Sequence, residues 1–124
     1  MAEDVFDPGF SDPLLERYLA DLGRHPRLDP QTERELLERY QATGDRAAAN
    51  RIIESNLRLV VAVAKKYRWR WASLLDLIQE GNVGLTIAIN RFDPSAGTPF
   101  SAYAGYWIRA MIFRYISANY RLVD

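Results

Sequence analysis

The chain has 124 residues, 16 acidic and 16 basic side chains, and 48% hydrophobic residues, a composition that suits one folded domain. It contains no cysteine, which excludes disulfides, a thiolate nucleophile and cysteine-ligated metals. Because it lacks a run of about 18 apolar residues and a secretory signal, we expect a cytoplasmic protein with no membrane span. The charge is uneven: residues 1–59 hold 12 acids and 8 bases, whereas residues 60–124 hold 4 acids and 8 bases.

Two helix-start signals occupy the first third of the chain. Residues 1–11 are acidic and predict a flexible tail. In the segment 12–44, Asp12-Pro13 and Asp29-Pro30 each place a capping aspartate before a proline, which favours the first turn of a helix. A glycine follows each apolar stripe, the second being Gly44, so we expect two helices here.

A longer helix is predicted over about 46–68, with Asp45 as its cap. Its apolar residues recur every three or four positions, as a core-facing stripe requires. These residues are Ile53, Leu57, Val60, Val61, Ala64 and Tyr67. The end of the helix is basic, which complements the helix dipole, and a phosphate contact is the alternative interpretation. The basic residues are Lys65, Lys66, Arg68 and Arg70.

The next helix is predicted to begin after Ser73, which forms a capping box with Asp76, and to end near Phe92. Gly81 and Gly84 lie inside it, although each costs up to about 1 kcal/mol relative to Ala. We therefore expect this helix to pack closely against another one. Its inner stripe consists of Ile78, Gly81, Leu85, Ala88 and Phe92.

The last helix is predicted over 99–121, and its apolar residues fall into two sectors on a helical wheel. One sector is rich in aliphatic residues and suits a core: Ala104, Ile108, Met111, Ile112, Tyr115 and Ile116. The other sector is aromatic with one arginine: Phe100, Tyr103, Tyr106, Trp107, Ala110 and Arg114. Rings beside a basic residue are typical of single-stranded nucleic-acid binding. A helix that packs on both sides is the alternative.

No catalytic constellation is recognisable, so we expect no enzyme activity, no metal and no cofactor. The single histidine, His25, adjoins a proline in a predicted connection. Asp76 and Glu80 are four residues apart on one helix, but no histidine or third acid stands at ligand spacing. Because no strand-like alternation occurs, the chain is predicted to be an all-α, compact bundle of about five helices.

The sequence from residue 56 onward resembles the promoter-melting domain of bacterial sigma factors. The matching strings are NLRLVVAVAKKY (56–67), LLDLIQEGNVGL (74–85), RFDPSAG (91–97) and FSAYAGYWIRAMI (100–112). Upstream, DPLLERYL (12–19) and LDPQTERELLERY (28–40) are similar to the weaker segment that precedes this domain. The resemblance implies a sigma domain 2-like fold over 12–124, with core-polymerase-binding helices over 45–92 and a promoter-melting helix over 99–121.

The resemblance also implies two sets of contact residues. In sigma factors the DLIQEGN helix binds a coiled coil of the largest subunit of core RNA polymerase. The matching positions are Asp76, Gln79, Glu80, Asn82 and Thr86. The aromatic helix captures non-template-strand bases of the minus-ten element as promoter DNA opens. The matching positions are Phe100, Tyr103, Tyr106, Trp107, Arg109, Ala110, Phe113 and Arg114.

The sequence departs from primary sigma factors, which usually carry methionine at Thr86, two tryptophans at Tyr106-Trp107, and Gln and Thr at Ala110 and Phe113. The run WIRAMIFRYISANYRLV instead resembles the heat-shock-type branch, which implies a different promoter preference. The chain stops at Asp124 without the family's helix-turn-helix module, so we expect a fragment or a truncated relative. A regulator of the anti-sigma or chaperone class would be a further partner. The alternative function is a sigma-like decoy that binds polymerase without opening DNA.

Overall fold

The computed structural model describes residues 13–22, 24, 26–68 and 73–123, and for residues 22 and 120–123 it describes the backbone alone. Within this part of the chain there are five helices and no strand. They are α2 (Pro13–Leu22), α3 (Pro30–Thr43), α4 (Arg46–Lys66), α5 (Leu74–Arg91) and α6 (Phe100–Val123). The all-α prediction is confirmed. The expectations for the tail 1–11, the Asp12 cap, His25 and Arg70 lie outside the described residues.

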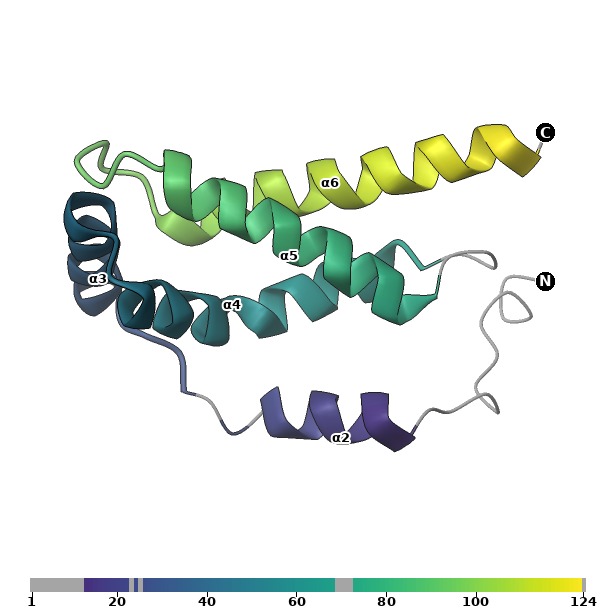
Figure 1. Cartoon of the computed structure of the whole chain (residues 1–124), viewed down its shortest axis with the longest axis horizontal. Helices are drawn as coiled ribbons and strands as arrows, with labels where there is room; N and C mark the ends of the chain where they lie inside the picture. Colours follow the sequence, from purple (N-terminus) through teal and green to yellow (C-terminus); the bar gives the residue numbers. More distant parts are fainter. Residues whose placement is uncertain (1–12, 23, 25, 69–72, 124) are drawn as a thin grey trace.

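The helices pack around α5, which lies between α6 and α4 (Figure 1). The α5–α6 pair forms the most extensive helix contact, and the two helices run in opposite directions. Helix α3 crosses α4 near the N-terminal end of α4. Helix α2 lies along the side of α4 that is remote from α6. This arrangement leaves one long face of α5 and one long face of α6 free of other described helices.

Local signals place the helix ends as predicted, except that the side chain of Asp29, before α3, makes no capping hydrogen bond. The Asp45 carboxylate accepts a hydrogen bond of 3.0 Å from the Ala47 backbone N–H at the start of α4. The Ser73 hydroxyl accepts one of 3.0 Å from the Asp76 N–H at the start of α5. Gly44 ends α3 with φ 74°, a left-handed conformation that a side chain would disfavour.

The core consists of the aliphatic sides of α4, α5 and α6, together with two leucines of α3. Its fully buried large side chains include Leu37, Ile52, Leu77, Ile78, Leu85, Ile89, Ile108 and Ile112. Burying each such side chain contributes about 1.5–3 kcal/mol. The aliphatic sector of α6 is therefore confirmed as the core side. In α4, however, Ile52 is fully buried while Ile53 and Leu57 are half-buried, because α3 packs against the helix beside the expected stripe.

The two internal glycines of α5 bring this helix into close contact with its neighbours, as predicted. A Cβ atom at Gly81 would lie 2.8 Å from Val60 Cγ1. A Cβ atom at Gly84 would lie 2.7 Å from the carbonyl carbon of Trp107. Real Cβ atoms do not approach so closely, and glycine is therefore required where α5 meets the backbone of α6.

Side chains of α3 bind the C-terminal end of α5. Gln41 Nε2 donates hydrogen bonds to the carbonyl oxygens of Ile89 (3.0 Å) and Phe92 (2.7 Å). The Tyr40 hydroxyl donates to Asn90 Oδ1 at 2.9 Å. Carbonyl groups at the end of a helix lack partners within the helix. Here α3 supplies partners and so fixes the turn that leads into α6.

Candidate functional site

The outer face of α5 carries the polar residues that the sequence singles out. Asp76, Gln79 and Thr86 are exposed, and Glu80 and Asn82 are half-buried. Two apolar side chains, Leu75 and Val83, lie among them and are each 46% exposed. The sequence analysis did not identify these two as contacts. Their signal is the spacing 75, 79, 83, which places one residue per helical turn on the same face.

This α5 patch is linked to α6 by one side-chain hydrogen bond. The Tyr115 hydroxyl donates to Asp76 Oδ2 at 3.4 Å. Burial raises the pKa of Tyr115, and the negative charges of Asp76 and Glu80 and the hydrogen bond raise it further. Asn82 Oδ1 is buried without a hydrogen-bond partner. The acidic patch therefore extends to a tyrosine of the neighbouring helix.

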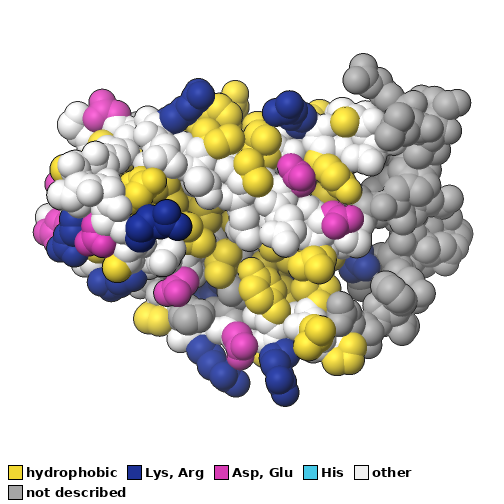
Figure 2. Space-filling view, viewed as in Figure 1, with side chains coloured by type: hydrophobic (Ala, Val, Ile, Leu, Met, Phe, Trp, Pro, Cys, Tyr) yellow, Lys and Arg dark blue, Asp and Glu magenta, His cyan; other side chains and the backbone are white. Residues whose placement is uncertain are grey.

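The outer face of α6 combines exposed rings with arginines. Tyr106 and Phe113 are 60% and 59% exposed. Two arginines, Arg109 and Arg114, are also exposed, and Tyr103, Trp107 and Ala110 are half-buried. Figure 2 shows basic and hydrophobic side chains next to one another along the edge formed by α6. Rings beside cations give this face the chemistry of a nucleic-acid surface.

Phe113 packs against Tyr67, the C-cap residue of α4. Its ring meets Tyr67 edge-on, with the ring centroids 6.2 Å apart. Lys65 and Lys66, in the last turn of α4, directly precede Tyr67 and are exposed. The basic end of α4 and the exposed rings of α6 therefore lie on the same region of the molecule.

The interpretation of the aromatic sector as a row of rings that face a nucleic acid does not hold for Phe100, which is 4% exposed and follows the alternative of a helix that packs on both sides. The centroid of its ring lies 5.2 Å from that of Phe92, and Phe92 in turn lies 5.4 Å from Tyr103. The turn after α5 folds Phe92 back over the first turn of α6. Phe100 therefore belongs to the hydrophobic core of the domain, together with Phe92, and Tyr103 packs against that core.

Trp107 lies where α6 contacts α5. The Arg91 guanidinium carbon is 5.3 Å from the centroid of its ring, and the Tyr106 ring meets it edge-on at 5.6 Å. The indole Nε1 is buried and has no hydrogen-bond partner. The ring is therefore held by packing against the core, Tyr106 and the Arg91 guanidinium, without a polar partner for its N–H group.

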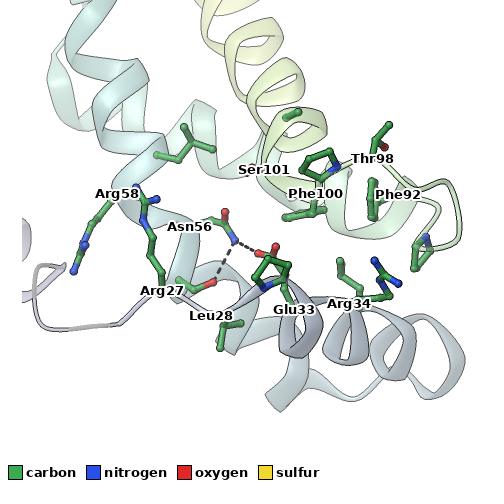
Figure 3. Close-up of a pocket in the computed structure, with 17 residues that line it drawn as sticks. Arg27, Leu28, Glu33, Arg34, Asn56, Arg58, Phe92, Thr98, Phe100 and Ser101 are labelled. Carbon is green, nitrogen blue, oxygen red and sulfur yellow. Dashed lines mark hydrogen bonds between the residues drawn. The ribbon is translucent and has the colours of Figure 1, made fainter.

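A pocket of ≈ 600 Å³ opens beside the start of α6 (Figure 3). Its walls come from three separate segments: residues 27–37, 55–59 and 92–102. Asn56 Nδ2 donates to Glu33 Oε2 (3.1 Å) and to the Ile52 carbonyl oxygen (2.8 Å). Burial raises the pKa of Glu33, and the hydrogen bond from Asn56 partly offsets that rise.

The lining of this pocket combines cationic, polar and aromatic groups. Arg27, Arg34 and Arg58 contribute positive charge, and Phe92 and Phe100 contribute apolar wall. Sequence reasoning does not find this pocket, because no local pattern indicates that these three segments meet. The buried ring of Phe100 therefore faces a cavity as well as the core.

A family model described as Sigma-70 region 2 matches residues 52–122, more than half of the chain. The chain belongs to the sigma-70 region 2 family. Its curated relatives include RNA polymerase sigma factor SigA of Clostridium acetobutylicum, 45% identical over 90% of this chain and 29% of the relative. SigA of a Bacillus species is 46% identical over 91% of this chain and 29% of the relative.

A relative with a different name is nearly as similar. RNA polymerase sigma factor RpoH of Rhizobium radiobacter is 42% identical over 88% of this chain and 36% of the relative. This sigma-70 region 2 chain therefore spans about a third of the length of the curated relatives it matches. The predicted resemblance to sigma factors is confirmed.

The described part of the chain lacks two features. None of its helices is both long and apolar enough to cross a membrane. No group of three or more His, Asp or Glu residues in that part is arranged to hold a metal ion.

Proposed function

We propose that this chain is the part of an RNA polymerase sigma factor that binds core polymerase and opens the minus-ten element of a promoter. The observation that carries the proposal is the pairing of two outward faces in a sigma-70 region 2 chain: a polar patch on α5, and rings with arginines on α6. Strand opening would be driven by binding, without nucleotide hydrolysis by this chain.

The α5 face would bind the coiled coil of the largest polymerase subunit. Its proposed contacts are Asp76, Gln79, Glu80, Asn82 and Thr86, together with Leu75 and Val83. Apolar side chains surrounded by polar ones are typical of the centre and rim of a protein–protein interface. The exposure of Leu75 and Val83 within the polar patch supports a partner at this face.

The α6 face would hold the unpaired strand. Extruding a base costs a few kcal/mol, and stacking on an aromatic side chain returns about 1–3 kcal/mol per base. Tyr103, Tyr106 and Trp107 would supply rings, and Arg109 and Arg114 would contact the backbone. The pocket beside Phe100 would accept a base of the same strand, because its walls are apolar, its lining is cationic and Asn56 can hydrogen-bond.

The promoter preference would follow the heat-shock-type branch. Neither Ala110 nor Phe113 has a side chain that can hydrogen-bond to a base edge, and Phe113 offers an exposed ring instead. The sequence identities to SigA (45%) and RpoH (42%) are too close to each other to assign this chain to either branch of the family. The proposed preference therefore depends on Ala110 and Phe113. Gln at Ala110 should change base preference at the upstream edge of the element.

A binding experiment with two sets of variants tests the proposed function. Core polymerase is captured with the chain and then cross-linked to single-stranded minus-ten DNA. Gln79→Ala with Glu80→Ala should reduce polymerase capture, whereas Tyr106→Ala with Phe113→Ala should reduce DNA cross-linking and leave capture intact. Polymerase capture without any DNA cross-linking by the unmodified chain would contradict promoter opening and support the decoy function.

A further inference from the structure

The contact between Arg91 and Trp107 joins the last residue of α5 to the middle of α6. The Arg91 guanidinium lies over the indole ring, 5.3 Å from its centroid, and the Tyr106 ring stands nearly perpendicular to the indole, with the centroids 5.6 Å apart. Arg91 itself is exposed, and Trp107 is half-buried. The contact therefore lies at the surface, where a bound nucleotide would meet it.

The indole N–H group of Trp107 is buried, and no hydrogen bond from it fixes this orientation of the ring. Nε1 has no hydrogen-bond partner, and leaving a buried donor unpaired is unfavourable. Another orientation of the ring that exposes Nε1 to water would remove that cost. Contacts of the ring must therefore hold it in place: the core and Tyr106 pack against it, and the Arg91 guanidinium over its face is the charged contact among them.

We propose that Arg91 is a positioning residue that holds the Trp107 indole in its present orientation by a cation–π contact. The ring face that Arg91 covers is then closed to an unpaired base until the guanidinium moves. This inference deepens the proposed function, since it makes Trp107 a gated stacking surface on α6. At an exposed site such a contact favours one orientation by about two- to fivefold.

Arginine suits this role better than lysine. Its guanidinium is planar and stacks on aromatic faces, whereas the ammonium of lysine is a compact and strongly hydrated charge. Either cation would complement the carbonyl end of the α5 dipole equally. Replacing Arg91 by Lys therefore separates stacking from charge, and replacing it by Met removes the charge while keeping an unbranched side chain.

The test measures the indole in the free protein. In a Trp69→Phe, Trp71→Phe background, Trp107 is the remaining tryptophan, so acrylamide quenching and the exchange rate of its indole N–H report on this ring. Arg91→Met should increase both, in line with a two- to fivefold loss of the covered orientation. Arg91→Lys should give intermediate values. Arg51→Met, at an exposed position of α4, is the matched control and should change neither.

The outcome separates this inference from the proposed function. Far-UV circular dichroism identifies any variant that fails to fold, and Arg91→Lys then carries the test. Unchanged quenching and unchanged indole exchange in folded Arg91→Met would overturn the role of Arg91. The unmodified chain failing to cross-link to single-stranded DNA would contradict the proposed function instead, and it would leave the quenching result standing.

Discussion

Gly84 of α5 contacts the backbone of Trp107 directly. A Cβ atom at position 84 would lie 2.7 Å from the carbonyl carbon of Trp107 and 2.9 Å from Ile108 Cα. Backbone atoms cannot move aside as a side chain can. The separation of α5 and α6 at this point, and with it the rotation that turns the rings of α6 outward, depends on the missing side chain.

Gly84→Ala should therefore destabilise the protein, because overpacking against backbone typically costs about 1–3 kcal/mol. Gly81→Ala is the matched comparison, since its Cβ atom would meet a side-chain atom, Val60 Cγ1, at 2.8 Å. That substitution should cost less, because a side chain can shift more readily than backbone, whereas the gain of up to about 1 kcal/mol in helix propensity is common to both variants. Urea unfolding of both variants measures the difference. Equal stability of Gly84→Ala and the unmodified protein would show that the helices can separate without cost.

The stability of the protein should depend on pH through Glu33. Its pKa is raised above 4.5 by burial, so the folded state holds this proton more tightly than the unfolded state. The penalty for ionising Glu33 in the fold is absent below the unfolded pKa and is complete above the folded pKa. Stability due to this group therefore falls as the pH rises through that window.

Glu33→Gln should remove the penalty. The variant should be more stable than the unmodified protein at pH 7 and equal to it well below pH 4.5, because a glutamine oxygen can still accept from Asn56. Glu38→Gln, at an exposed position of the same helix, is the control and should show no such difference. Urea unfolding at several pH values measures this. A stability gain that persists unchanged in acid would mean that ionisation of Glu33 is not its cause.

Asp76→Asn should lower the pKa of Tyr115. The negative charge of Asp76 and its hydrogen bond from the tyrosine hydroxyl both raise that pKa, while burial and Glu80 continue to act in the variant. Titration of the tyrosine ring carbons followed by NMR measures the shift. Gln79→Ala, one helical turn away, is the control. A Tyr115 titration that does not move in Asp76→Asn would show that the two side chains are not in contact in solution.

Aromatic residues of α6 should separate into two classes when replaced by alanine. Phe100→Ala should cost about 3–5 kcal/mol of stability, because a buried ring leaves a cavity. Tyr106→Ala and Phe113→Ala should cost much less, since both rings are largely exposed. They should instead weaken binding of single-stranded DNA by about 1–3 kcal/mol for each ring that stacks on a base. Thermal unfolding and fluorescence anisotropy give the two readouts, and large stability losses at Tyr106 or Phe113 would contradict this division.

Local sequence signals predict the helices well, because caps and glycine stops act within a few residues. Asp45, Ser73 and Gly44 act where the sequence indicates. The burial of Phe100 could not be predicted in this way, since it depends on a turn that folds Phe92 back onto α6. The pocket could not be predicted for a related reason. Three segments far apart in the chain form it, and no periodic pattern in the sequence indicates that they come together.

The hydrogen bonds from Gln41 to the end of α5 bear on how small a working piece of this protein can be. The family match begins at residue 52. Gln41, whose side-chain amide donates hydrogen bonds to the carbonyl groups of Ile89 and Phe92, lies upstream of that match. A chain trimmed to the matched residues would lose those hydrogen bonds and the Tyr40–Asn90 bond. We therefore expect the smallest stable unit to include α3, because this helix stabilises the turn that orients the aromatic helix.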